Sequence, residues 1–264
     1  MNDAFYIAAT GMQAQQVSLD TIANNLTNMS TVGYKRSQVS FSDLVAGAPP
    51  VTDAGGAATG AAPVPATLRI GAGVGIAGIA KQFDAGDIKQ TGAPLDVAIQ
   101  GDGFLEVTLP DGTRGYTRGG SLKVALDGQL VTPSGLTLAP GIVIPSGAQN
   151  LAITPDGRVQ FTIAGRTGTV EAGQLTLVRF ADPTKLAVQG DNLYRATDGS
   201  GEPIAGKAGE DGMGLLAQGM LESSNVKMID ELVGMMIAQR AYEASAKVVQ
   251  AADEMSSLAN GLRR

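Results

Sequence analysis

The sequence of 264 residues contains neither histidine nor cysteine. Without imidazoles and thiolates, the chain cannot build a zinc site from these ligands, a Ser-His or Cys-His nucleophile pair, or a redox dithiol. Any catalysis would have to rest on Asp, Glu, Lys, Tyr or Ser. We therefore expect no catalytic residues, no metal and no cofactor, and we interpret the chain as a protein that is not an enzyme.

Charge is also scarce, and basic charge most of all. Charged residues make up 17% of the chain, against about 25% in an average soluble domain. The 19 Lys and Arg against 25 Asp and Glu give a formal net charge of −6, and no stretch concentrates the basic residues. This distribution excludes the usual footprint of nucleic-acid binding and makes acidic membrane surfaces poor partners. We expect neither a nucleic-acid partner nor a small-molecule substrate.

The pattern predicts neither a membrane-spanning helix nor a cleaved secretion signal. No uninterrupted apolar run approaches the roughly 18 residues that a membrane helix needs. Asp3 precedes the first apolar residues, and the first basic residue is Lys35, whereas a signal peptide begins with positive charge.

Glycine and proline are nearly absent from the two ends of the chain. The first 45 and the last 39 residues contain four of the 36 glycines and none of the 12 prolines. Because both residues interrupt helices, this partition predicts two helical ends that enclose a turn-rich β interior. The expected fold class is α+β, with a discontinuous coiled-coil domain at the ends and a mainly β middle domain.

The N-terminal pattern predicts a helix from Ala4 to about Met29. Asp20 is the only charged residue in this range, so we expect neighbours to cover even its polar face. Its apolar residues follow a heptad rhythm: Phe5, Met12, Leu19 and Leu26 repeat every seven residues, and Ala8, Ile22 and Met29 occupy d-type positions three residues after members of this series.

The C-terminal pattern predicts a second helix, from Val226 to about Leu258, with two apolar stripes. One partner helix covers one stripe, so we interpret the pair as a packing unit of a polymer; an ordinary intramolecular helix pair is the alternative. The first stripe is Ile229, Val233, Met236, Val248, Ala251, Met255 and Leu258, and the second is Leu232, Met235, Tyr242 and Val249.

The middle of the chain favours a barrel or sandwich. Residues 46–67 are rich in Gly, Ala and Pro and indicate an extended linker or a long hairpin-like excursion. Three Asp-Gly turns, at residues 111–112, 127–128 and 156–157, each separate two β-type runs and predict hairpins.

A few short motifs match those of nucleotide-binding proteins and enzymes, but these matches are weak. Gly73, Gly75 and Gly78 satisfy G-x-G-x-x-G, but no long helix follows to receive a pyrophosphate. The S-x-x-K string that begins at Ser224 lacks the partner motifs of penicillin-recognising enzymes. Twenty-five carboxylates leave a secreted β-domain carbohydrate-active enzyme as an alternative function of another class, although nothing selects a catalytic pair.

Three strings in order resemble the signatures of flagellar basal-body rod and hook proteins. They are SLDTIANNLTNMSTVGYKR at residues 18–36, the block LDVAIQGDGF to LTLAP at 95–140, and residues 219–254 with LESSNV and QRAYEASAKVV. Thr27 departs from the usual Ala. Within the family, the chain length, the insertion before Arg69 and the string IGAGV at 70–74 are most similar to distal rod proteins. Proximal rod proteins and the hook protein are the alternatives.

The resemblance implies a structural subunit of a helical, hollow drive shaft that transmits torque from motor to hook and passes exported subunits. The implied partners are copies of the chain itself, proximal rod proteins, hook-side proteins, surrounding ring proteins and the flagellar export apparatus. The implied location is the basal-body rod across the periplasm, reached through type III export without a cleaved signal peptide.

By the same resemblance, the terminal helices form the subunit contacts. The expected domains are 1–29 with 228–264 as the helical core, 30–70 with 206–227 as a connecting region, and 71–205 as a β-rich outer domain. The pair Asn24 and Asn25 either ends a fraying helix or forms hydrogen bonds between subunits. The implied packing residues are Phe5, Met12, Leu19, Ile22, Asn24, Asn25, Leu26, Ile229, Val233, Met236, Tyr242, Val248 and Met255.

Overall fold

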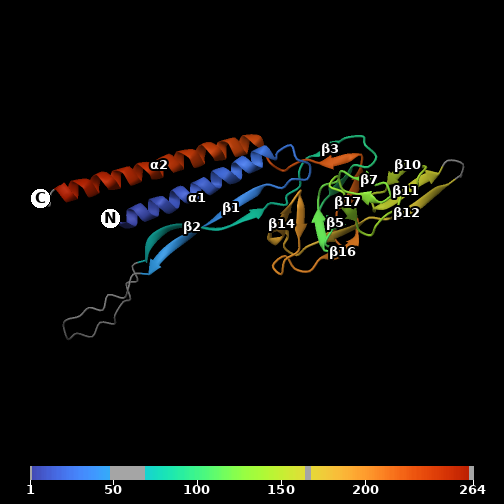
Figure 1. Ribbon diagram of the computed structural model, residues 1–264, viewed down its shortest axis with the longest axis horizontal. Helices are drawn as coiled ribbons and strands as arrows, with labels where there is room; N and C mark the ends of the chain where they lie inside the picture. The colour runs from blue at the N-terminus through green and yellow to red at the C-terminus, as the bar shows by residue number, and fades with distance from the viewer. Residues whose placement is uncertain (1, 48–68, 164–167, 262–264) are drawn as a thin grey trace, which may run out of the picture. The chain divides into compact units, whose positions relative to one another are not determined.

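A computed structural model describes residues 2–47, 69–163 and 168–261 (Figure 1). The chain divides into two compact units. Unit 1 comprises Met1–Asn24, Gln38–Ile79 and Ile229–Arg264, and unit 2 comprises Asn25–Ser37 and Ala80–Met228. Long helices at both ends and strands between them confirm the predicted α+β class.

Unit 1 is built mainly from two helices and a two-stranded sheet. The helices are α1 (Asn2–Thr27) and α2 (Met228–Gly261), and the strands are β1 (Ser37–Gly47) and β2 (Arg69–Lys81). The breaker-poor ends are helical as predicted, and each helix boundary falls within three residues of the expected one.

The two helices of unit 1 lie side by side and run antiparallel (Figure 1). The helices meet at Gly11 and Gly234: a Cβ on Gly11 would lie 3.5 Å from Ser245 Oγ, and one on Gly234 would lie 3.5 Å from Ile22 Cδ1. Both distances are ordinary van der Waals contacts, so each glycine packs against a side chain of the other helix.

Strand β2 packs against the other side of α1. The backbone N–H of Val74 donates to the Thr10 hydroxyl at 3.4 Å, and a Cβ on Gly73 would collide with that hydroxyl. Gly73, with φ of +112°, is thus required both by conformation and by space. The G-x-G-x-x-G string lies entirely within β2 and does not lead into a helix N-terminus.

The Gly-rich residues 46–67 fall mostly outside the described part of the chain. Residues 46 and 47 end β1, and residues 48–67 are not described. Strands β1 and β2, on either side of this stretch, pair with each other.

Unit 2 is a β unit with antiparallel pairing between its strands. It contains a nine-stranded sheet in the order β14-β15-β6-β5-β9-β8-β7, to which β13 adds beside β5 and β16 beside β13. A second sheet has the order β10-β11-β12, and two further pairs are β4 with β17 and β3 with β18. The strands are β3 (Ile88–Gln90), β4 (Val97–Gln100), β5 (Phe104–Thr108), β6 (Arg114–Thr117), β7 (Lys123–Val124), β8 (Leu130–Val131), β9 (Thr137–Leu138), β10 (Ala148–Ile153), β11 (Arg158–Ile163), β12 (Thr169–Gln174), β13 (Thr176–Arg179), β14 (Ala187–Gly190), β15 (Leu193–Arg195), β16 (Ile204–Lys207), β17 (Leu215–Gln218) and β18 (Met220–Glu222), with a 3-10 turn at Pro183–Lys185.

The three predicted Asp-Gly hairpins are confirmed. They join β5 to β6, β7 to β8, and β10 to β11. Their glycines, Gly112, Gly128 and Gly157, have φ of +78°, +83° and +90°. Glycine adopts positive φ at no steric cost, which is why the dipeptide predicts the turn so well.

Two apolar clusters form the interior of unit 2. The larger one fills the space between the strands with aliphatic side chains such as Val97, Leu105, Leu130 and Leu177, each at most 1% exposed. The smaller one is aromatic, and its rings meet edge to face at centroid distances of 4.8 to 6.0 Å. This geometry is the favoured one for aromatic pairs.

No helix in the described ranges has both the length and the hydropathy that crossing a membrane requires.

The glycine pair after β6 generates a matched test of packing. A Cβ on buried Gly120 would collide with the Val97 carbonyl oxygen, whereas a Cβ on Gly119 would lie 3.3 Å from Thr117 Oγ1. We expect Gly120→Ala to lower the free energy of unfolding by about 3 kcal/mol, and Gly119→Ala to change it by less than about 1 kcal/mol. Urea denaturation of both variants measures this, and equal effects would contradict the close approach of Gly120 to the Val97 carbonyl.

Candidate functional site

A cluster of buried charges in unit 2 joins one residue from each of the three strings that carry the family resemblance. Lys35 precedes β1, Arg118 follows β6, and Glu222 ends β18. The Lys35 ammonium donates to Glu222 Oε1 at 2.7 Å, and Arg118 Nε donates to Glu222 Oε2 at 2.9 Å. The three side chains are 0 to 3% exposed. Residues about 100 to 190 positions apart thus meet at one carboxylate.

Backbone groups complete the hydrogen bonding of this cluster. The Gly86 N–H also donates to Glu222 Oε1 at 2.9 Å, and Lys35 Nζ donates to the Asp84 carbonyl at 2.7 Å. The Arg118 guanidinium donates to the carbonyls of Gly101 and Gly103 at 3.0 and 3.2 Å. A buried ion pair is tolerable only when its remaining donors and acceptors are satisfied in this way.

Burial and the neighbouring charges shift the pKa values in this cluster. Burial raises the pKa of Glu222, but Arg118, the Lys35 ammonium and the Gly86 N–H together hold this pKa below its usual value. Burial lowers the pKa of Lys35, and the Arg118 charge lowers it further, against the opposing effects of Glu222 and Asp84. Glu222 is therefore the anion on which two buried cations depend.

The side chains of two asparagines form hydrogen bonds with backbone groups near the cluster. Asn25 Nδ2 donates to the Ser37 carbonyl at 2.9 Å, and Asn25 Oδ1 accepts from the Ser37 N–H at 2.8 Å and from the Tyr34 hydroxyl at 3.2 Å. Asn225 Oδ1 accepts from the Arg36 N–H at 2.7 Å, while its Nδ2 donates to the Gln82 carbonyl at 2.9 Å. Both side chains act here as bridges between backbone segments.

Lys81 adds a further cationic contact. Its ammonium donates to the Lys35 carbonyl at 2.8 Å and lies 3.9 Å from the centroid of the Tyr34 ring. Burial lowers the pKa of Lys81 to about 8. The aromatic face stabilises the cation that burial disfavours.

We call this network the junction: Asn25, Tyr34, Lys35, Lys81, Arg118, Glu222 and Asn225. The chain passes between the two units after residues 24, 37, 79 and 228. A junction residue or its hydrogen-bond partner lies within three residues of each of these four positions: Asn25, Ser37, Lys81 and Asn225. The junction thus lies close to the residues at which the chain enters and leaves unit 2. Its hydrogen bonds and ion pairs hold these segments together.

The residues implied for subunit packing differ in burial between the two helices. On α1, Phe5, Met12, Leu19, Ile22 and Leu26 are partly buried, Asn24 is exposed, and Asn25 is buried in the junction. On α2 all six are exposed: Ile229, Val233, Met236, Tyr242, Val248 and Met255, at 76%, 44%, 54%, 41%, 51% and 56%. Their role between subunits stays a prediction.

The side of α2 that is covered within the chain consists largely of small residues. Ala238 and Ala252 are buried, Gly234 and Ser245 approach α1, and Glu231 is also buried. Of the implied packing residues, Ile22 meets α2 at Gly234. The six implied packing residues of α2 are therefore exposed, whereas Met235 and Val249 are partly buried.

Sequence reasoning missed Lys35, Arg118, Glu222 and Asn225. All four stand inside the strings that carry the family resemblance. The one available signal was their place inside these strings, which does not single them out from the other polar residues there. No periodicity links residues so distant along the chain, so their meeting could not be derived from spacing.

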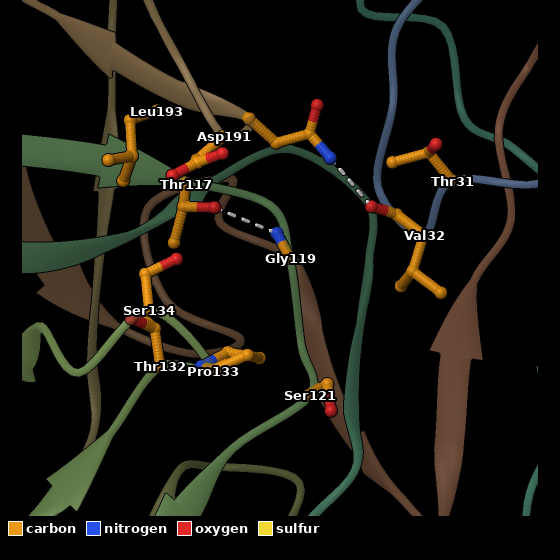
Figure 2. Close-up of a pocket in the computed structure, with 11 residues that line it drawn as sticks. Thr31, Val32, Thr117, Gly119, Ser121, Thr132, Pro133, Ser134, Asp191 and Leu193 are labelled. Carbon is orange, nitrogen blue, oxygen red and sulfur yellow. Dashed lines mark hydrogen bonds between the residues drawn. The ribbon is translucent and has the colours of Figure 1, made fainter. Parts of the chain in front are cut away.

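Unit 2 also carries a pocket of about 250 Å³ whose lining includes threonine and serine hydroxyl groups (Figure 2). Thr117, Thr132 and Ser134 face it with the carboxylate of Asp191, while Asn192 Nδ2 donates to the Val32 carbonyl at 2.9 Å on its rim. The lining contains one carboxylate, whereas glycoside hydrolysis by the common mechanisms requires two. This pocket therefore does not support the carbohydrate-active alternative.

The junction predicts a large effect of a small substitution. Glu222→Gln leaves Lys35 and Arg118 buried beside a neutral amide, and we expect the free energy of unfolding to fall by about 3 to 5 kcal/mol at pH 7. Glu106→Gln is the matched control, since its partner Arg114 is 70% exposed at 3.3 Å, and should cost less than about 1 kcal/mol. Chemical denaturation of both variants measures these changes. An equal fall in the free energy of unfolding for both would show that the buried ion pairs of Glu222 stabilise the protein no more than the exposed pair of Glu106.

The lowered pKa of Glu222 also predicts a pH dependence. The stabilisation from its ionised form is fully present above the unfolded-state pKa of about 4.3 and is lost as pH falls through the lower folded-state pKa. The difference in unfolding free energy between wild type and Glu222→Gln should therefore shrink between pH 5 and the acid limit of folding. A difference that stays constant over this range would exclude the ionised carboxylate as its source.

Comparison with known proteins places the chain. Descriptions of three protein families match it: the flagella basal body rod protein at residues 5–35, the flagellar hook protein FlgE/F/G D1 domain at 98–161, and the flagellar basal body rod FlgEFG protein C-terminal region at 217–262. These ranges contain most of the junction.

Similarity to individual proteins extends over the whole chain. It is 42% identical to the flagellar basal-body rod protein FlgG of Borreliella burgdorferi over all of both chains, and 42% identical to that of Buchnera aphidicola over 97% of each. The flagellar basal-body rod protein FlgF of Caulobacter vibrioides is 32% identical over 97% of this chain and 96% of its own. The chain therefore belongs to the family of flagellar basal-body rod proteins.

Proposed function

We propose that the chain is the structural subunit of the distal part of the flagellar rod. It polymerises helically into a hollow shaft that transmits torque from the motor to the hook and passes exported subunits. The identity of about 40% to several FlgG proteins over nearly the full length carries this proposal, and the likeness to FlgF is lower. A proximal rod or hook position is the alternative within the family.

The exposed apolar side of α2 supports polymerisation. Large apolar side chains such as Ile229, Met236 and Met255 are more than half exposed in the single chain. Soluble monomers rarely leave contiguous patches of this kind uncovered. In the polymer, α1 and α2 would pair as a coiled coil whose outward side is covered by helices of other copies.

Contacts between copies of such a shaft are heterologous. Two different patches of each copy meet, and a screw operation repeats the contact without closing it, which generates an open filament. The residues from Phe5 to Leu26 on α1 and from Ile229 to Met255 on α2 are our candidates for these contacts. Exposed Asn24 is a candidate for hydrogen bonding between copies.

The junction suits the mechanical role of such a subunit. The chain segments that connect the two units begin and end near the junction, so torque carried along these segments loads its hydrogen bonds. Charge-assisted hydrogen bonds with fixed geometry resist rotation there better than apolar contacts alone.

The remaining expectations concern the proteins that contact the shaft and the route by which the chain is exported. We propose that proximal rod proteins, hook-side proteins and the surrounding rings contact the shaft where it crosses the periplasm. We further propose that the flagellar export apparatus delivers the chain without cleavage of a signal peptide. The family of rod proteins, whose members assemble with other basal-body components, supports this set.

Electron micrographs of basal bodies test the proposed function. In a strain that lacks this chain, we expect truncated rods without hooks, and full rods again when the complete chain is restored. Restoring a chain without residues 1–29, or one without 228–264, should leave the rods truncated because the subunit contacts are missing. A complete rod with a hook in the strain that lacks the chain would refute the assignment.

A further inference from the structure

The first half of α2 presents an outward apolar stripe. Within nine residues it carries five large apolar side chains, on the side of the helix opposite Glu231, Gly234 and Ala238. We call this set the α2 stripe: Ile229, Leu232, Val233, Met236 and Ile237, which are 76%, 42%, 44%, 54% and 64% exposed.

The same unit carries an apolar groove of about 620 Å³, which we call the α1–β2 groove. Its lining is uncharged and consists of small or apolar residues from three elements. With little beyond Cα or Cβ on the alanines and glycines, the floor of the groove lies close to the backbone, and large side chains can enter. The residues that matter are Ala4, Ile7 and Gly11 of α1, Gly73 and Val74 of β2, and Val248 of α2.

We propose that the α1–β2 groove receives the α2 stripe of a second copy of this chain. The inference rests on the proposed polymeric function and names the surfaces that meet. The two surfaces are complementary, since one is convex with large apolar side chains and the other is hollow with small ones.

The stripe of the same chain cannot fill the groove. Gly11 lies opposite Ser245 and Ile22 opposite Gly234, so the stripe stands beside the second half of α1. The groove lies at the first half, on the order of 16 Å away along the helix at 1.5 Å per residue. The stripe also faces away from α1, so another copy must supply the occupant.

Charges on α2 fit a parallel arrangement of the two copies. Exposed Asp230 and Arg240 lie at the two ends of the stripe, and exposed Lys247 and Glu254 lie beside and beyond the groove residue Val248. A parallel shift that brings Val233 of one copy beside Val248 of the other is 15 residues, or about 22 Å. It places Asp230 within two residues of Lys247 and Arg240 within one residue of Glu254.

A parallel shift is also what polymer symmetry requires. Copies related by a screw operation keep the same polarity, and contact between two different patches generates an open filament. Stripe and groove are two such patches on one chain. Each copy therefore offers its stripe to one neighbour and its groove to another.

The absence of cysteine makes a disulfide test specific. We would coexpress Ile7→Cys and Met236→Cys as separate full-length chains in a strain lacking the native chain, isolate basal bodies, and oxidise them. We expect a covalent dimer of the two variants, because their Cβ atoms would come within disulfide range of about 4 Å. Glu243→Cys in place of Met236→Cys is the control, on the same outward side of α2 but two turns further along, and should form at most a tenth as much dimer.

The outcomes separate this inference from the proposed function. Rods that contain both variants but yield no dimer between positions 7 and 236, or as much dimer with the control, would overturn the docking and leave the rod function intact. Complete rods in a strain without the chain would instead refute the proposed function itself.

A second variant keeps the test informative if the cysteine chains assemble poorly. Met236→Glu places a charge on an exposed position, so the monomer should keep its helical circular dichroism. We expect the concentration for self-association of the purified full chain to rise at least tenfold, whereas Gln239→Glu, on exposed α2 surface beside the stripe, should change it less than twofold. Assembly of Met236→Glu at the wild-type concentration would contradict the proposal.

Discussion

The ionised carboxylate of Glu222 is the interaction on which the organisation of unit 2 depends. It accepts from a lysine, an arginine and a backbone N–H that belong to three distant stretches of the chain. The two cations would be costly to bury without an anion, and the Gly86 N–H would be costly to bury without an acceptor. The arrangement therefore permits one placement of the incoming and outgoing segments, and the strand pairs β3 with β18 and β4 with β17 extend from that point.

The helical ends obey a different constraint, which is the size of their side chains. The side of α2 that meets α1 includes Gly234, Ser245 and buried alanines, while several large apolar residues of α1, such as Met12 and Leu19, are partly buried. Several large side chains of α2, such as Ile229 and Met236, remain exposed, where an isolated subunit gains nothing from them. A shaft needs many modest contacts that are made only on assembly, and the exposed apolar side chains of α2 are available for such contacts.

The elements that could be predicted are those whose signals are local. The two helices follow from apolar periodicity and missing breakers, and the three hairpins follow from Asp-Gly turns whose glycines need positive φ. The junction could not be predicted, because nothing in the neighbourhood of Lys35 or Glu222 indicates a partner more than 180 residues away. The outward position of Met236 was also undetermined, since a helical stripe looks the same whether its partner is in the same chain or in another.

By itself, then, the sequence determined the helical ends, the β middle with its turns, the exclusion of thiol and imidazole chemistry, and the family resemblance, because composition and short-range patterns carry all of these. The tertiary structure alone decided which charges are buried together, which side of α2 is covered by α1, and where a groove opens between α1, β2 and α2. These properties depend on distances between residues far apart along the chain, and such distances exist only once the chain has folded.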